Sequence, residues 1–333
     1  MGFLVWRRVF SIIALLFAVS LVCGCGGGAA TVVQGEPGVA DSGDGADSGG
    51  ADIGAADPGG GAQGVLSPDS TPRAYNDDWQ IRVANAAGEV LFCFTEAELD
   101  GFFPEGEGLF SQVYSTINNW PTERFYVAEG YSVTGLLHAA GLDDSVMSIT
   151  FRAEDGYEAT FTRGQLFSEQ YYFPRVGEDG GGAEPVFPMI AYRWREGTGD
   201  LADLRDDKPI FIFGQRDPFE HSNPAFVVGV TEIVVDDAPR GTWQEAGTFP
   251  SPGPIEMGGA VKLQHNYFGL VKLFYTLDGS DPTPLSALYN PSTYQLELNR
   301  PIVVTEPVTI KVLVTGYGMD DSEVASFEFW PEG

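Results

Sequence analysis

The chain is 333 residues long, and 43% of its residues are hydrophobic and 13% aromatic, which is enough apolar material to form buried cores. Its 47 acidic and 18 basic residues give a formal net charge of -29 at pH 7. A charge of this sign repels phosphate backbones, so nucleic acid is not expected as a partner. Only three cysteines are present, so stability is expected to come from packing and not from a disulfide framework.

The N-terminal segment has the pattern of an export signal. Arg7 and Arg8 precede an apolar stretch at 9–21, which is shorter than the ~20 apolar residues of a membrane-spanning helix. The residues VCGC at 22–25 resemble the bacterial lipobox, in which a small residue precedes the cysteine that carries lipid. The resemblance implies that residues 1–25 are a signal peptide with lipobox, and that Cys25 anchors a lipoprotein at the outer face of a bacterial membrane or cell surface. Modification at Cys23 and an ordinary cleaved secretory signal are the alternatives.

Residues 26–72 differ in composition from the rest of the chain. They contain seven acidic residues and no basic ones, among frequent Gly, Ala, Ser and Pro. A segment of this kind cannot bury enough apolar area to offset its chain entropy. We therefore expect a disordered, acidic tether between the anchor and the folded part.

Residues 73–240 are expected to form a first folded domain. Alternating apolar and polar residues predict strands at 79–85 and 88–94, and the Thr-x-x-Glu pattern in TEAELDGFF predicts a short helix at 95–103. Further strands are predicted at 111–117, 145–153, 157–163, 208–214 and 226–237, and a helix at 131–142 that ends at Gly141. Strands and short helices mixed without a regular alternation favour an α+β fold.

Two stretches of this domain carry a family resemblance. The run YSVTGLLHAAGLDDSVMSITFRAEDGYEATFTRGQL and the run KPIFIFGQRDPFEHSNPAFVVGVTEIVV resemble the sulfite-oxidase-type molybdopterin-binding domain. The resemblance covers about residues 78–237 and implies a molybdenum held by a cysteine, but Ser115 stands near that cysteine's place. A hydroxyl is a much poorer ligand than a thiolate for this chemistry, so we expect a degenerate cofactor position without metal or pterin. Retention of molybdopterin is the disfavoured alternative.

Two groups of side chains are candidates for ligand binding. Tyr171, Tyr172, Tyr192 and Trp194 lie in an aromatic segment at 168–197 and are able to stack on sugars, with core packing as the alternative interpretation. Arg216 and His221 lie in the polar loop GQRDPFEHSNP that follows a predicted buried strand. The alternative for Arg216 is a structural ion pair with Asp217 or Glu220.

The region at 250–333 is expected to be a second domain built only of strands. Short strands at close spacing, at 260–267, 270–279, 294–299, 301–306, 308–316 and 323–330, predict an Ig-like β-sandwich. The phrase FYTLDGSDPTPLSALYNP, followed by VTIKVLVTGYGMDDSEV, resembles the chitobiase/β-hexosaminidase C-terminal-type domain. In the turn LDGSDPT, Asp278 and Ser280 are expected to bond backbone amides, and Gly279 to supply a positive φ.

These observations predict a lipid-anchored extracellular surface protein that binds a polysaccharide or cell-wall component without catalysis. The alternatives are an oxidoreductase that keeps molybdopterin through unusual ligands such as Ser115, and a structural envelope protein that binds no small ligand. The sequence contains no phosphate-binding loop and no zinc-protease or nucleophile-elbow motif, so whether the chain is an enzyme stays open, with binding favoured.

Overall fold

The computed structural model of the protein describes residues 80–95, 108–142 and 144–332. The predictions for residues 1–72, Cys25 included, lie outside these ranges, as does almost all of the helix predicted at 95–103. Within the described ranges, no helix is long and apolar enough to cross a membrane.

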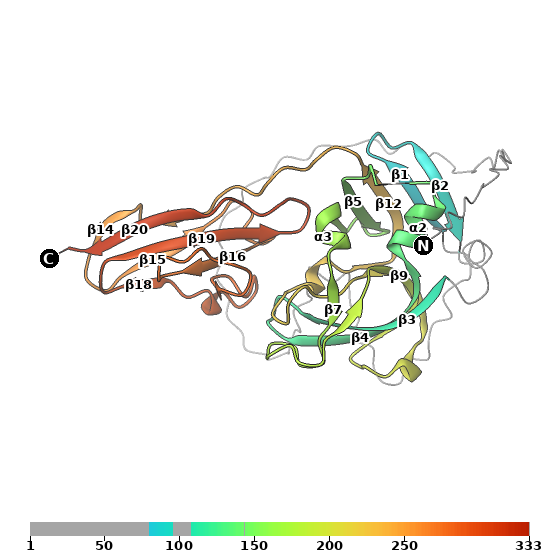
Figure 1. Ribbon diagram of the computed structural model, residues 1–333, viewed down its shortest axis with the longest axis horizontal. Helices are drawn as coiled ribbons and strands as arrows, with labels where there is room; N and C mark the ends of the chain where they lie inside the picture. The colour runs from blue at the N-terminus through green and yellow to red at the C-terminus, as the bar shows by residue number, and fades with distance from the viewer. Residues whose placement is uncertain (1–79, 96–107, 143, 333) are drawn as a thin grey trace, which may run out of the picture. The chain divides into compact units, whose positions relative to one another are not determined.

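The described part begins with two five-stranded sheets, which Figure 1 shows in cyan to orange. The first has the order β2-β1-β12-β5-β6 and comprises β1 (Gln80–Asn85), β2 (Val90–Thr95), β5 (Ser148–Ala153), β6 (Glu158–Thr162) and β12 (Val230–Asp236). The second has the order β11-β10-β9-β4-β3 and comprises β3 (Leu109–Ile117), β4 (Glu123–Ser132), β9 (Met189–Glu196), β10 (Asp206–Ile212) and β11 (Val227–Val228). β7 (Gln170–Tyr172) and β8 (Glu184–Val186) form a separate ribbon.

Aromatic side chains fill the core between these two sheets. Phe151 from β5 stacks on Phe211 from β10 with ring centroids 3.6 Å apart, and Phe161 from β6 meets the same ring edge-on. Neighbouring strands in both sheets are antiparallel, except for β1 and β12, which pair in parallel. β12, the last strand of this region, therefore lies in the middle of the first sheet, between β1 and β5. On β5, Phe151 is buried whereas its neighbour Arg152 is exposed, as expected for side chains that point to opposite faces of a strand.

The C-terminal region is built of two further sheets around its own core. One has the order β13-β15-β18, with β13 (Gly247–Phe249), β15 (Gly259–Gln264) and β18 (Ile302–Val304). The other has the order β14-β20-β19-β16-β17, with β14 (Gly253–Ile255), β16 (Val271–Thr276), β17 (Ala287–Leu288), β19 (Val308–Gly316) and β20 (Ala325–Pro331). Buried Val, Leu and Ile side chains from both sheets meet between them, so the predicted all-β sandwich is confirmed.

The α+β class predicted for residues 73–240 is not supported, because the described residues there are mostly strand. The helices are α2 (Val133–Ala139) and α3 (Arg163–Phe167), with short 3-10 turns η1 (Leu201–Asp203) and η2 (Asn223–Ala225), and a third, η3 (Leu296–Leu298), in the C-terminal region. The helix predicted at 131–142 is therefore shorter than expected, because β4 continues to Ser132, which caps α2. α2 ends at Ala139, two residues before the predicted end at Gly141, and Gly141 follows the C-cap Ala140 with a φ of +73°.

Candidate functional site

A cavity of about 550 Å³ is enclosed by side chains from the loop after β10, from β6 and from β16 and its neighbours. This volume lies within the ~300–1,000 Å³ range of small-molecule sites. Aromatic rings and charged side chains both line the cavity, so it has an apolar body and a few polar groups. We call it the central cavity. Of the residues singled out in the sequence, Arg216 and His221 belong to its wall.

The contacts that build the central cavity are specific. Gln165 donates from Nε2 to the carbonyls of Gly316 and Met319 at 2.7 Å, and its Oε1 accepts from the Gly318 amide at 2.9 Å. The ring of Tyr317 packs against Phe161 and Phe213 with centroids 5.0 and 5.4 Å away. These contacts hold the end of β19 against β6 and β10, so the cavity has a fixed wall on this side.

Arg216 is engaged in an ion pair inside the cavity. Its Nε donates to Glu220 Oε1 at 2.8 Å, its backbone amide donates to Glu220 Oε2 at 2.6 Å, and Tyr317 also donates to Glu220 Oε1 at 2.8 Å. The structural ion pair with Glu220 that the sequence offered as the alternative for Arg216 is thus present. Asp217, beside it, has its pKa raised to about 6, first by burial and then by the charge of Glu220.

His221 and Lys272 form a second polar group in the cavity wall. Lys272 Nζ donates to Asn119 Oδ1 at 3.5 Å and to the Asn290 carbonyl at 3.3 Å. Burial lowers the pKa of Lys272 to about 8. Burial and then the charge of Lys272 lower the pKa of His221 to about 3, so this imidazole is neutral at physiological pH. The His221 Nδ1 atom is buried and has no hydrogen-bond partner.

Aromatic side chains form much of the remaining wall. Trp243 and Tyr267 lie with ring centroids 5.9 Å apart, and the Trp243 indole donates to the Gly316 carbonyl at 3.0 Å. Tyr157 donates to the Pro224 carbonyl, and Phe274 lies on β16 two residues beyond Lys272. Tyr267 is 53% exposed, so one ring face is available to a ligand without rearrangement.

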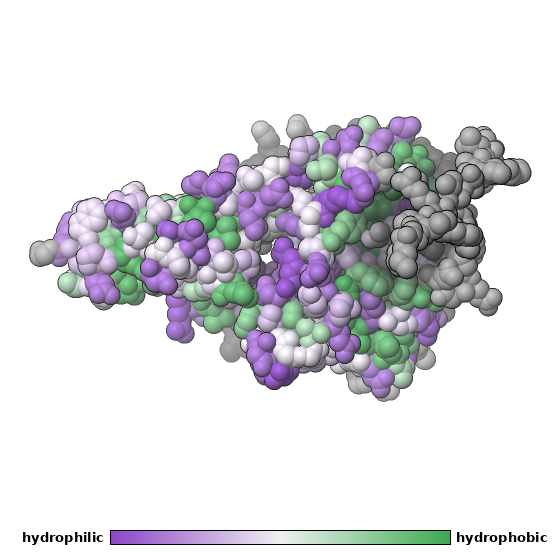
Figure 2. Space-filling view, in the orientation of Figure 1, coloured by the Kyte–Doolittle hydropathy of each residue, from purple (hydrophilic) through white to green (hydrophobic). Residues whose placement is uncertain are grey.

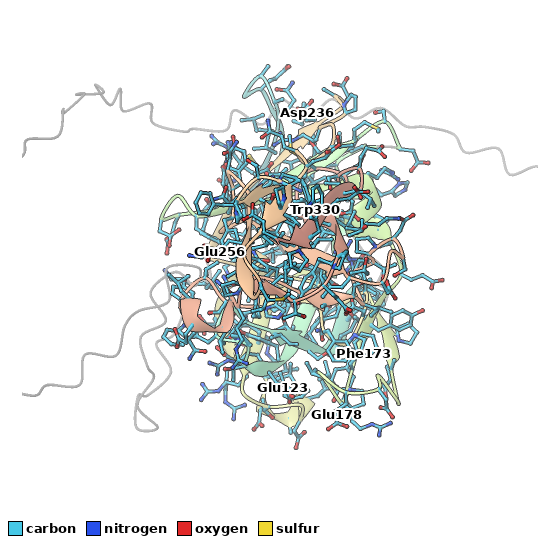
Figure 3. The ribbon with its side chains drawn as sticks, turned by 90° about the vertical axis from the view of Figure 1, so that its left-hand side faces the viewer. Glu123, Phe173, Glu178, Asp236, Glu256 and Trp330 are labelled. Carbon is cyan, nitrogen blue, oxygen red and sulfur yellow. The ribbon has the colours of Figure 1, made fainter. Side chains whose placement is uncertain are left out.

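The structure does not bring the four aromatic candidates of the 168–197 segment into the central cavity. Tyr192 is buried in the main core, and Trp194 packs against that core while its indole donates to the Lys208 carbonyl at 2.9 Å. Tyr171 packs on a small core of Ile117, Phe173 and Val176. Tyr172 meets Phe125 edge-on at 6.4 Å. Figure 3 shows Phe173 near Glu123 and Glu178, at the lower edge of the view.

Ser115 is fully buried on β3 and both of its hydrogen-bonding functions are in use. Its hydroxyl donates to Gln215 Oε1 at 2.6 Å and accepts from the Phe173 amide at 2.8 Å. Asn118, three residues further along, accepts the amides of Trp120 and Thr122 at 2.9 and 3.0 Å with its side-chain oxygen. Asn118 therefore closes a tight turn, and the Ser115 hydroxyl is engaged within the protein. Neither residue fits a ligand set for molybdenum.

Sequence reasoning did not single out Lys272, Trp243 or Tyr267. Lys272 sits in the run VKLFYT, where alternation places it on the face opposite the buried Val271 and Leu273, as for any solvated lysine. Nothing in that pattern shows that Asn119, about 150 positions earlier, covers this face. Within the described residues, no group of His, Cys, Asp and Glu side chains has the arrangement of a metal site.

The turn at 277–283 matches most of its predicted chemistry. Asp278 Oδ1 accepts from the Ser280 amide at 3.0 Å, and Gly279 has a φ of +83°. Ser280 differs from the prediction, because its hydroxyl donates to the Asp278 carboxylate at 2.6 Å instead of bonding an amide. These hydrogen bonds lower the pKa of Asp278 and make it a turn residue.

Comparison with known proteins identifies one part of the chain. No curated protein matches it. Among solved structures, the sulfane dehydrogenase SoxCD from Paracoccus pantotrophus is similar over 77% of this chain and 76% of that chain, with 10% sequence identity and a TM-score of 0.30, which does not establish a shared fold. Residues 247–326 match the chitobiase/beta-hexosaminidase C-terminal domain, which confirms the resemblance drawn from FYTLDGSDPT for the C-terminal region.

Proposed function

We propose that this protein is a non-catalytic binding protein whose ligand, a segment of a polysaccharide or cell-wall glycan, occupies the central cavity. The observation that supports this proposal most directly is the wall of the cavity, where aromatic rings, among them the exposed ring of Tyr267, lie beside hydrogen-bonding groups. Sugar rings combine an apolar face with a rim of hydroxyl groups, and a pocket of this composition complements both.

The polar groups of the cavity suit binding better than chemistry. The Arg216 guanidinium and the Glu220 carboxylate neutralise each other, and Tyr317 donates to the same carboxylate oxygen. Asp278, in the turn that gives its family its signature, is engaged in local hydrogen bonds.

We also propose that the protein acts outside the cell, held at a membrane by lipid on Cys25 with residues 26–72 as a spacer. The basis is the lipobox-like sequence and the composition of the spacer. Metabolic labelling with a fatty acid analogue should tag the wild-type chain and the Cys23→Ala variant. The Cys25→Ala variant should remain untagged, and tagging of that variant would refute the anchor.

Binding can be tested with a glycan array probed by the full chain in mild detergent. We expect the wild type and the Trp330→Ala variant to bind the same saccharides, because Trp330 is an exposed aromatic residue outside the cavity wall. Tyr267→Ala should weaken that binding about tenfold, since it removes the exposed stacking face. The absence of any bound saccharide would refute the proposal and favour a structural envelope role.

A further inference from the structure

Lys272 differs from the other charged residues in the central cavity. Within the described residues it makes no ion pair, and its ammonium group meets only the neutral oxygens of Asn119 and Asn290, at 3.5 and 3.3 Å. Both distances are long for an ammonium donor, whose charge-assisted bonds measure about 2.7–2.9 Å. The side chain therefore has donor capacity left over.

The carboxylates of the cavity do not neutralise this ammonium. Glu220 is occupied by Arg216 and Tyr317, and Asp217 accepts from the Phe219 amide at 2.8 Å. Burial of Lys272 lowers the pKa of its amine. A buried cation without a counter-ion is costly, so folded proteins ordinarily pair one.

The surroundings of Lys272 also limit the charge of a complementary ligand. His221 is neutral, so it does not share the task of binding an anion. Glu158, Asp217, Glu220 and Asp321 line the same cavity, and the whole chain carries a net charge of -29. This field opposes a doubly charged phosphate more than a singly charged carboxylate, because the repulsion grows with the charge of the ligand.

We infer that the saccharide bound in the central cavity is acidic and carries a carboxylate, as a hexuronic acid does, which Lys272 binds as its counter-ion. This inference rests on the proposed function and specifies its ligand. The carboxylate forms an ion pair with the Lys272 ammonium in place of its long contact with Asn119. Tyr267 and Trp243 contact the apolar face of the sugar ring. Figure 2 shows hydrophobic and hydrophilic residues mixed on the visible face.

Matched saccharide pairs test the inference on the full chain. The probes are the methyl glycosides of galacturonic acid and of mannuronic acid, each with a single carboxylate, beside their methyl esters, in which the ring is kept and the charge is removed. Isothermal titration calorimetry at pH 7 should show at least one acid binding tenfold or more tightly than its ester. Lys272→Met should reduce the affinity for the acid to that of the ester, and Lys272→Arg should retain the preference. Lys262→Met, at an exposed position of β15, is the control and should change nothing.

The outcomes separate the inference from the function on which it rests. Equal binding of acid and ester by the wild type, or binding by the esters alone, would overturn the acidic ligand while leaving saccharide binding intact. An acid preference that survives in Lys272→Met would overturn the role of Lys272. Failure of all four probes and of neutral saccharides to bind would overturn the proposed function and the inference with it.

Discussion

At the scale of single residues, the cavity depends on two groups whose protonation is set by burial. Lys272 has its pKa lowered to about 8 and His221 to about 3. The sequence pointed to His221 through its polar loop, but it gave no sign of Lys272. A lysine between two buried strand positions looks solvated until the partner segment that covers it is known. That partner, Asn119, follows closely after Ser115, the degenerate cofactor position that the sequence indicates.

The first prediction concerns the pH dependence of acidic saccharide binding. The wild type should lose affinity as pH rises above about 8, because an uncharged amine has no attraction for a carboxylate. The other charged groups of the cavity are Glu158, Arg216, Asp217, Glu220, Arg240 and Asp321. Asp217, with a pKa of about 6, is ionised throughout the range from pH 7 to 10. Calorimetric titrations over that range should show no such loss in Lys272→Arg, and an equal loss in both proteins would contradict the assignment.

The second prediction concerns stability in acid. Because the pKa of His221 falls from 6.5 to about 3 on folding, the unfolded chain binds the extra proton between these values. The free energy of unfolding therefore decreases as the pH falls below 6.5, because protonation of the imidazole favours the unfolded chain. Urea titrations at pH 7 and pH 4.5 give the loss in free energy of unfolding over this range. We expect this loss to be about 1–2 kcal/mol smaller in His221→Gln than in the wild type. Asp217 acts with the opposite sign and is present in both proteins, so it cancels. Identical drops would contradict the burial of this imidazole.

At the scale of elements, alternation predicted strands well where one face meets solvent. The strands at 80–85, 148–153 and 158–162 were anticipated, whereas β4 and β9 were missed because each mixes charged, aromatic and small residues without a clear apolar-polar alternation. The prediction of a strand at 294–299 was wrong, since the 3-10 turn η3 lies there. Tyr294, at its start, stacks on Trp120 at 5.3 Å, a contact between distant segments that local pattern does not contain.

The third prediction concerns the turn between β19 and β20. Gly318 has a φ of +88°, and a methyl group there would lie 3.2 Å from the Thr160 carbonyl oxygen. Gly258 has a φ of +77° with open space around it, which makes it a matched control. In urea denaturation, Gly258→Ala should cost about 1 kcal/mol for the left-handed backbone alone, and Gly318→Ala about 1–2 kcal/mol more. Equal costs would show that the turn does not pack against β6 as closely as described.

At the scale of the whole molecule, two cores are joined by contacts around Gln165 and Tyr317, and by contacts of Asn119 and Trp120 with the second region. The sequence separated the two regions by composition and identified the family of the second, a resemblance that the match at 247–326 confirms. It could not foresee that a cavity would lie where they meet, because none of the residues that join them forms a local pattern. The ring of Tyr317 belongs to the second region and packs against the core of the first.

The fourth prediction concerns cooperativity of unfolding. Gln165→Ala removes the hydrogen bonds to Gly316, Gly318 and Met319, so the two cores should unfold less cooperatively. Calorimetry should show one transition for the wild type and a broadened or split one for the variant. Thr162→Ala removes only the helix cap that Thr162 and Gln165 share, and it is the control. A single sharp transition in Gln165→Ala would contradict this coupling.

The central claim, that the cavity between β6, β10 and β16 binds a saccharide, is tested most directly by saturation-transfer-difference NMR on the full chain. We predict that saturating the aromatic protons transfers magnetisation to the ring protons of methyl galacturonoside or another saccharide of the panel. The transfer should fall sharply in Tyr267→Ala and persist in Trp330→Ala. Transfer that is absent from the wild type, or unchanged in Tyr267→Ala, would contradict the account.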